Sequence, residues 1–67
     1  MFEVSKKKMG SAMLVAKIGS AKDLAVLSGV SVNTISRLSN GGRAKLATIQ
    51  ALAEALHVDP AELLEEA

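Results

Sequence analysis

The side chains best suited to recognition chemistry lie close together between positions 32 and 37. They are Val32, Asn33, Ser36 and Arg37. An amide, a hydroxyl and a guanidinium bind their targets by hydrogen bonding, and a valine contributes apolar contact. These residues interrupt an apolar helical pattern, so they are expected on the outer face of a helix. Such a set predicts binding to a partner rather than the making or breaking of bonds.

Other candidates for chemistry are weaker. His57 is the only histidine, and it has no second metal-ligating residue of a suitable kind nearby, so we interpret it as a residue at a helix end. Glu62, Glu65 and Glu66 resemble a carboxylate cluster, but they have no nucleophile partner, and a solvated face is the simpler interpretation. The sequence has no phosphate-binding glycine loop. We therefore expect no enzyme activity, no metal or cofactor, and no small-molecule site.

The elements that must position these residues follow from the apolar periodicity and its breaks. The breaks are Gly19-Ser20, Ser28-Gly29, Asn40-Gly41-Gly42 and Val58-Asp59-Pro60. They divide the chain into five expected helices, at about 5–18, 21–28, 32–39 and 46–56 and from residue 60 onward. The sequence therefore predicts an all-α fold, a compact bundle of about five short helices in a single domain over 1–67.

Two of these helices are joined by a tight turn within residues 21–39. Ser20 and Ser31 are good N-cap residues, and Gly29 suits the left-handed conformation that ends a helix abruptly. The residues expected to face inward from this unit are Leu24, Ala25, Leu27, Val30, Ile35 and Leu38. This arrangement predicts a helix-turn-helix, in which the second helix projects into the major groove of a duplex.

The remaining helix boundaries are marked unevenly. Asp59, Pro60 and Glu62 form the pattern of a capping box with proline at the first helical position. The helix at 46–56 has no good capping residue, because only Ala44 or Lys45 precedes it. In the first helix, the residues expected to form the apolar stripe are Met9, Met13, Leu14, Ala16 and Ile18.

The charge is distributed asymmetrically along the 67 residues. Residues 1–45 carry all eight cations and two anions, a net charge of +6, whereas residues 46–67 carry five anions, a net charge of −5. This pattern favours one side that faces a polyanion, although chance scatter over solvated faces is the alternative. Residues 1–8 are expected to form a basic, partly disordered start that adds nonspecific attraction to phosphate.

The start of the chain also has features of a signal peptide, being basic, then apolar, then rich in small residues. Gly10, Ser11 and Lys17 interrupt its apolar run, which argues against that interpretation. No apolar run approaches the roughly 20 residues that a membrane span requires. The sequence has no cysteine, so no disulfide or thiolate metal site is expected.

Several motifs carry a resemblance to a known family. They are Leu24-Ala25, Gly29-Val30-Ser31, Thr34-Ile35-Ser36-Arg37-Leu38, Asn40-Gly41 and the run TIQALAEALHVDPAELL. They resemble the Cro/CI-type, or lambda repressor-like, helix-turn-helix domain over roughly residues 9–65. The resemblance implies a cytoplasmic DNA-binding domain of bacteria or phages, with residues 32–39 as the recognition helix in the major groove.

The resemblance also implies roles for individual residues. The expected base-reading residues are Val32, Asn33, Ser36 and Arg37. Asparagine pairs with adenine and arginine with guanine, each through two hydrogen bonds, and valine offers contact to a thymine methyl. The expected phosphate-binding residues are Ser20, Lys22, Thr34, Asn40, Arg43 and Lys45. Together they predict phosphate contacts that set the register and a helix that reads sequence.

The sequence departs from the family pattern at three positions. Ala21 stands where a polar residue, often glutamine, is usual, so a DNA contact there is not expected from this side chain. Ser39 replaces a glutamate that often forms a buried ion pair. His57 replaces a glycine and must therefore accept a left-handed or helix-end conformation at modest cost.

The predicted function is sequence-specific binding of double-stranded DNA by a small transcriptional regulator, such as a repressor. We expect a weak homodimer, or a dimer formed on a two-fold symmetric operator, with Leu63, Leu64 and the loop near Gly42 as candidate contacts. The alternative is an antitoxin-like or adaptor module that binds a protein through its apolar C-terminal helices. A plain helical hairpin without a nucleic acid partner is the least specific interpretation.

Overall fold

The molecule consists of short helices packed around one another, with a small sheet at one end. A computed structural model describes residues 1–66. Its elements are β1 (Phe2–Glu3), α1 (Lys6–Val15), α2 (Ala21–Ser28), α3 (Val32–Leu38), β2 (Arg43–Ala44), α4 (Leu46–Leu56) and the 3-10 helix η1 (Pro60–Leu63). The all-α class is confirmed, but the described residues hold four α-helices, because the expected fifth helix is a single 3-10 turn.

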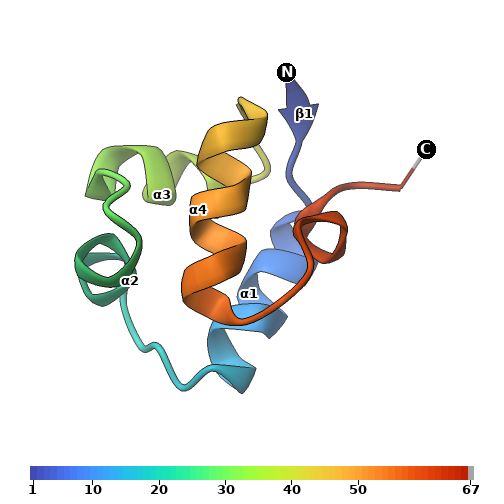
Figure 1. Ribbon diagram of the computed structural model, residues 1–67. Coiled ribbons are helices and arrows are strands. Elements are labelled where there is room, and N and C mark those ends of the chain that lie inside the picture. Colours follow the sequence, from blue (N-terminus) through green and yellow to red (C-terminus); the bar gives the residue numbers. More distant parts are fainter. Residues whose placement is uncertain (67) are drawn as a thin grey trace.

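Helix α4 packs against both α2 and η1. In Figure 1, α2 and α3 lie on one side of it, and α1 and η1 lie on the other. The α2 helix packs against both α3 and α4, whereas η1 packs against α4 and α1. The 11 residues of α4 make it the longest helix, and no helix within residues 1–66 is long and apolar enough to cross a membrane.

The core draws side chains from every helix. Its buried apolar members are Val4, Met9, Leu24, Ile35, Leu38, Ala44, Ile49, Leu52, Ala53, Leu56 and Leu63. Both buried residues of α3, Ile35 and Leu38, are 0% exposed. Burying these two side chains fixes the rotation of α3 about its axis, because they lie three positions apart on one helical face. The opposite face of α3 is therefore held toward solvent.

The caps of the helix-turn-helix are those expected from the sequence. The Oγ atoms of Ser20 and Ser31 accept hydrogen bonds from the third residues of α2 and α3, each at 3.2 Å. Gly29 adopts φ 76° and donates its N–H to the carbonyl oxygen of Ala25 at 2.9 Å. Without a Cβ it enters this left-handed conformation freely, so α2 ends and α3 begins within three residues.

Two helices end with a non-glycine residue in the left-handed conformation. His57 follows α4 with φ 59°, the left-handed conformation expected of a residue that replaces a glycine there. Val58 N–H donates to the carbonyl of Ala53 at 3.0 Å. Lys17 has φ 60°, and Ile18 N–H donates to the carbonyl of Met13 at 2.9 Å. Both patterns are Schellman motifs. The first helix was predicted to continue to residue 18 and instead ends at Val15, because this turn uses Lys17 rather than the later glycine.

The start of α4 and the start of η1 differ in their caps. Lys45 precedes α4 without a side-chain cap, as its sequence predicted. Asp59 caps η1 with a complete capping box: Asp59 N–H donates to Glu62 Oε2 at 3.0 Å, and Asp59 Oδ1 accepts from Ala61 N–H at 2.9 Å. The chain leaves η1 in an extended conformation at Leu64, so no further helix follows within residues 1–66.

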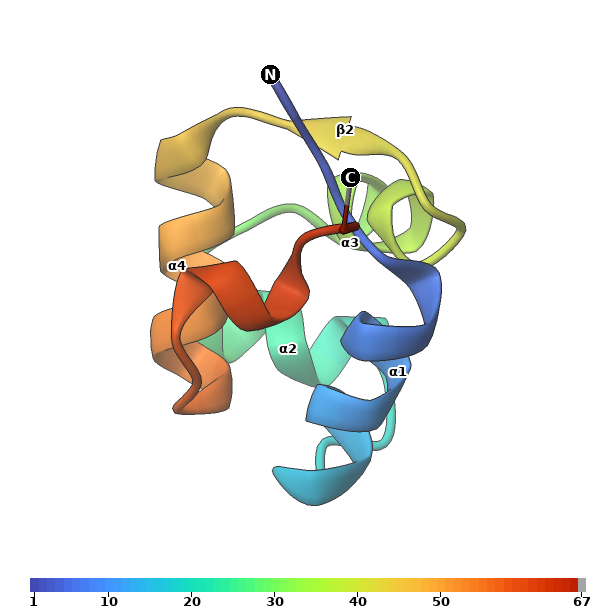
Figure 2. The ribbon, with the colours of Figure 1, turned by 90° about the vertical axis from the view of Figure 1, so that its right-hand side faces the viewer.

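The sheet at the end of the molecule was not predicted. Strand β1 pairs antiparallel with β2, with Phe2 opposite Ala44 and Glu3 opposite Arg43. On its other side, Glu65 N–H donates to the carbonyl of Glu3 at 2.9 Å. Figure 2 shows this end of the chain, where the N-terminal segment lies between β2 and the C-terminal segment. Backbone groups on both sides of β1 are thus paired, which stabilises a strand of only two residues.

The expectation of a disordered start over residues 1–8 does not match the fold of this segment. Val4 is 1% exposed and Ser5 is 4% exposed. Ser5 caps α1 by accepting a hydrogen bond from Lys8 N–H at 3.2 Å. The segment is held because Val4 fills a core position. The sequence does not reveal this, because nothing distinguishes Val4 from the exposed apolar residues Met1 and Phe2 beside it.

Two residues expected in the core are instead exposed. Leu27 is 63% exposed and Leu14 is 79% exposed. In α2 the last inward position is taken by Ser28, whose Oγ donates to the carbonyl of Leu24 at 2.7 Å and accepts from Val30 N–H at 3.2 Å. Leu27 therefore turns to the edge of the helix, beside α4, where it lines an open depression with Ala51 and Ala55.

Candidate nucleic-acid interface

Helix α3 presents the four side chains that the sequence singled out. Val32, Asn33, Ser36 and Arg37 are all exposed, and Val32 retains 41% of its accessible surface. Val32 and Asn33 form the first turn, and Ser36 and Arg37 form the last. Because the opposite face of α3 is buried, these four side chains share one outward surface.

Asn33 and Thr34 differ in how they are held. The side chain of Asn33 makes no hydrogen bond within residues 1–66, so both its amide donors and its oxygen are available to a partner. Thr34 is half-buried, and its Oγ1 accepts from Ser31 Oγ at 2.9 Å. The Thr34 hydroxyl can still donate its own proton outward. This geometry suits a hydrogen bond from Thr34 to an anionic oxygen.

Arg37 is tied to the loop that follows its helix. Its Nη1 donates to the carbonyl oxygen of Arg43 at 2.8 Å. An arginine guanidinium carries five N–H donors, so this bond leaves most of them free. No sequence pattern indicates this contact, because it joins the side chain of a helical residue to a backbone carbonyl six residues later.

The end of α3 is closed by a short series of backbone bonds. Asn40 N–H donates to the carbonyl of Arg37 at 3.1 Å, and Gly41 N–H donates to the carbonyl of Leu38 at 3.0 Å. Gly41 has φ 88°, the left-handed stop expected from Asn40-Gly41. The Asn40 amide Nδ2 donates to the carbonyl of Ser36 at 3.0 Å, so this side chain is folded back onto α3.

The expected phosphate-binding residues lie at three places on the fold. Ser20 and Lys22 flank the start of α2, and both are exposed. Thr34 lies in the first turn of α3, and Asn40 lies two residues past its end. Arg43 lies in β2 and Lys45 directly before α4, and both are exposed, although both were expected in a loop.

Almost all of the basic side chains are free of acidic partners. Within residues 1–66, the only ion pair joins Lys8 to Glu66, with Nζ and Oε1 at 3.1 Å. The cations of the interface are therefore not neutralised by the protein itself. Unpaired cations on one surface attract a polyanion at long range and release its counterions on binding.

The comparison with known protein families gives a direct result. The Cro/C1-type HTH DNA-binding domain matches residues 8–65. The chain belongs to this family. Searches of curated proteins and of solved structures gave no match. Membership of the Cro/C1-type family supports DNA binding by a regulator, and it agrees with the resemblance carried by the helix-turn-helix and the downstream run.

Two of the three departures from the Cro/C1-type pattern, Ala21 and Ser39, have visible consequences at this surface. Ala21 is half-buried and packs against the core, so the first position of α2 offers no polar group to DNA. Ser20 and Lys22 are the exposed residues on either side. Ser39 caps the end of α3, with its N–H donating to the carbonyl of Ile35 at 2.8 Å, and it forms no ion pair.

One basic residue lies nearer to the end of α3 than the sequence of this Cro/C1-type domain indicates. Lys6 was grouped with a nonspecific basic start, but its Cβ lies 4.0 Å from the point where a Cβ on Gly41 would stand. Lys6 is thus next to the loop that closes α3. No sequence signal identifies this neighbour, because the approach depends on the pairing of β1 with β2.

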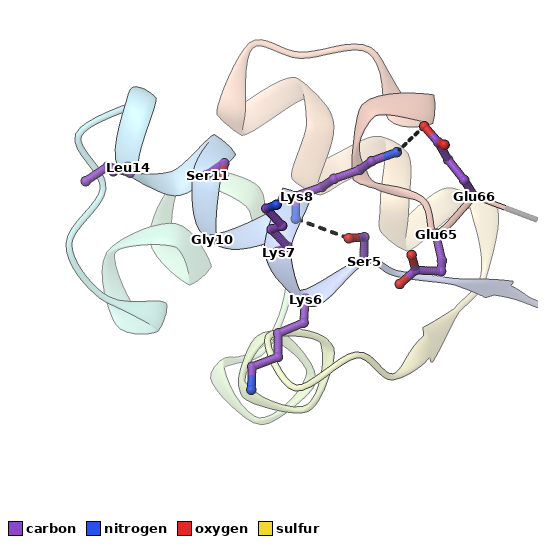
Figure 3. A pocket seen from close by; sticks show the side chains of 9 residues that line it. All are labelled: Ser5, Lys6, Lys7, Lys8, Gly10, Ser11, Leu14, Glu65 and Glu66. Carbon is purple, nitrogen blue, oxygen red and sulfur yellow. Dashed lines mark hydrogen bonds and ion pairs between the residues drawn. The ribbon is translucent and has the colours of Figure 1, made fainter.

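Lys8 occupies the other side of the same helical turn. Its Nζ donates to the carbonyl of Leu64 at 3.2 Å as well as pairing with Glu66. Figure 3 shows Lys8 reaching toward Glu66, while Lys6 extends in a different direction, away from both of them. The open depression drawn there is bordered by lysines on one side and by Glu65 and Glu66 on the other. Two neighbouring lysines therefore have different roles available to them.

Proposed function

We propose that this domain binds a specific duplex sequence, with α3 in the major groove, and that it acts as a transcriptional regulator of the repressor type. One observation carries the proposal: α3 buries Ile35 and Leu38 completely and presents Val32, Asn33, Ser36 and Arg37 together on its outer face. A helix held in this way offers a fixed set of contacts to base edges.

Each exposed residue of α3 has a distinct contact in this proposal. Asn33 pairs with adenine through its free amide. Arg37 pairs with guanine through those N–H groups that do not donate to the carbonyl oxygen of Arg43. Val32 packs against a thymine methyl. Ser36 is the weakest of the four, because a hydroxyl bonds to several bases without strong preference.

The phosphate contacts come from residues around α3. Ser20 and Lys22 reach one stretch of backbone from the start of α2. Arg43 and Lys45 reach the backbone from the segment after α3. Asn40 contributes the amide proton that its bond to Ser36 leaves free, and Thr34 contributes its hydroxyl. Lys6 is added to this set because it lies beside Gly41. Such contacts set orientation and register, and the α3 side chains supply sequence preference.

The test is a titration of labelled duplex DNA followed by fluorescence anisotropy at several salt concentrations. A random-sequence duplex should bind with an affinity that falls with log salt, each neutralised phosphate contributing a slope of about −0.9. A sequence selected from a random pool should then bind more tightly than the random duplex, by a factor of about 10³ or more. Absence of binding at low salt contradicts DNA binding, and equal affinity for both duplexes contradicts sequence specificity.

Dimer formation on DNA is the second part of the proposal. Of the contacts expected from the sequence, Leu63 is only 1% exposed and Leu64 is half-buried beside Val4, so the C-terminal region offers less apolar surface than expected. This favours two copies meeting on a two-fold operator, with half-sites about one helical turn apart. Analytical ultracentrifugation with a palindromic duplex should show two protein chains per duplex, and one chain per duplex contradicts the proposal.

The rival proposal, an antitoxin-like or adaptor module, loses its main support. It required the apolar C-terminal helices to face a partner protein, but Leu52, Leu56 and Leu63 are buried in the domain itself. The salt titration separates the two proposals, because a domain that binds only protein has no reason to bind duplex DNA with a steep salt dependence.

A further inference from the structure

Gly42 lies directly against Arg37. A Cβ built on Gly42 would stand 3.2 Å from Arg37 Cγ, 3.2 Å from the carbonyl oxygen of Arg37 and 3.5 Å from Arg37 Nη1. The first two distances are shorter than ordinary van der Waals contacts between these atom types. Gly42 thus lacks a side chain at the place where the stem of Arg37 crosses the loop on its way to the carbonyl of Arg43.

The backbone of Gly42 does not itself require glycine. Its φ lies outside the left-handed region, unlike those of Gly29 and Gly41. The residue is also held in place, because its carbonyl oxygen accepts a hydrogen bond from Val4 N–H at 3.0 Å and β2 begins at the next residue. An added Cβ would therefore press on both the side chain and the carbonyl oxygen of Arg37, and of these two the side chain is the more easily moved.

We propose that Gly42 is a specificity-determining position that acts through Arg37. Without a Cβ at position 42, the Arg37 stem lies flat on the loop and Nη1 stays on the Arg43 carbonyl, which fixes the direction of the remaining guanidinium donors. This inference rests on the proposed function, in which those donors read a base. Gly42 touches no base in this proposal and is a positioning residue.

The physical reason for such a device is preorganisation. A long arginine side chain in solvent samples many rotamers, and ordering it on binding costs free energy. A guanidinium that is already held by one hydrogen bond loses less freedom when it binds a base through a planar pair of donors. The competing interpretation is that Arg37 only ties down the loop and never meets a base.

The experiment is a double-mutant cycle with Gly42→Ala, Arg37→Ala and the double variant. The readout is the ratio of the affinities for the selected duplex and for a random duplex, measured by anisotropy at one salt concentration. Gly10→Ala is the matched control, because a Cβ there meets nothing within 4 Å and its φ is not left-handed. Thermal unfolding of each variant shows whether the fold is retained.

Gly42→Ala should lower this ratio by about fivefold or more, the lower end of what one paired side chain contributes to base discrimination. It should leave the affinity for random DNA and the salt slope unchanged. In the Arg37→Ala background, adding Gly42→Ala should change the ratio by less than about twofold. The effects of independent substitutions on free energy add, so loss of the Gly42→Ala effect when Arg37 is absent shows that position 42 acts through Arg37. Gly10→Ala should leave the ratio unchanged.

The inference is overturned if Gly42→Ala keeps the wild-type ratio of affinities. It is also overturned if Gly42→Ala lowers this ratio equally in the wild-type and in the Arg37→Ala background. If Arg37→Ala itself keeps the wild-type ratio, the inference fails while base reading by Asn33 stands. If the wild-type protein shows no discrimination at all, the proposed function and the inference both fail.

A second measurement on the wild-type protein covers the case in which Gly42→Ala does not fold. The chain has two arginines, Arg37 and Arg43. NMR of their side-chain Nε–H groups should show slower guanidinium rotation at Arg37 than at Arg43, whose side chain makes no hydrogen bond within residues 1–66. Equally fast rotation at both arginines overturns the inference.

Discussion

Lys8 and Leu64 join two distant parts of the chain: the Lys8 Nζ donates to the carbonyl oxygen of Leu64 at 3.2 Å. The same ammonium pairs with Glu66. Lys6, two residues earlier, has no hydrogen bond or ion pair within residues 1–66 and lies beside the loop that closes α3. The two lysines carry the same charge, so they form a natural pair for separating structural from DNA-binding roles.

Lys6→Ala should reduce the slope of log affinity against log salt by about one, because it removes one phosphate contact. Lys8→Ala should leave this slope unchanged and should instead lower the free energy of unfolding by about 1 kcal/mol, since it removes one partly buried hydrogen bond and one exposed ion pair. Salt-dependent anisotropy and urea unfolding measure the two quantities. Equal changes in slope for both variants would show that only total charge matters.

Arg37→Ala should weaken binding to the selected duplex by about 1–3 kcal/mol and should change binding to random DNA little. The reason is that a paired guanidinium contributes only where its base is present. Anisotropy with both duplexes gives the comparison. If the two affinities fall by the same factor, Arg37 serves phosphate or the loop and not a base.

Gly29→Ala and Gly10→Ala should shift stability in opposite directions. A Cβ meets nothing within 4 Å at either position, so sterics with neighbours do not distinguish them. Gly29 has φ 76°, and alanine in that conformation costs about 1–2 kcal/mol. Gly10 lies inside α1, where alanine is favoured over glycine by about 1 kcal/mol. Urea unfolding of both variants tests this, and a stabilised Gly29→Ala would mean that the turn is not left-handed.

Leu63→Ala should destabilise the domain by about 2–5 kcal/mol, because Leu63 is 1% exposed and its truncation leaves a cavity between η1 and the rest of the core. Leu14→Ala is the matched control, since Leu14 is 79% exposed and its truncation should change stability by less than about 0.5 kcal/mol. Urea unfolding midpoints give both values. A small effect at Leu63 would indicate that η1 is not docked in solution.

The sequence predicts those parts of the fold that depend on neighbouring residues. Ser20, Ser31 and Asp59 cap helices as expected, and Gly29 ends α2 as expected, because each of these effects acts over a few positions. The exposed face of α3 is also predictable from helical periodicity. Whether Val32, Asn33, Ser36 and Arg37 read bases stays a prediction.

The features that the sequence does not predict arise from contacts between distant or irregularly placed groups. Strand β1 exists because residues 2–3 meet residues 43–44 and the segment after η1, and no local pattern encodes that meeting. Lys17 ends α1 in a conformation that favours glycine, so the nearby Gly19 misleads. Leu27 is apolar yet exposed, because Ser28 takes the inward position through its hydrogen bonds to the backbone.

The N-terminal segment lies between β2 and the segment after η1, and this has a consequence for the order in which the molecule folds. Val4 N–H donates to the carbonyl of Gly42, and Ser5 N–H donates to that of Leu63 at 2.8 Å, so the first residues meet partners about 40 and 60 positions away. Contacts between such distant positions form late, because closing a long loop of chain costs entropy before the contact stabilises it. During synthesis, this arrangement cannot be completed until residues 63–65 have left the ribosome. A partly made chain therefore has its helices before its first residues are held on both sides.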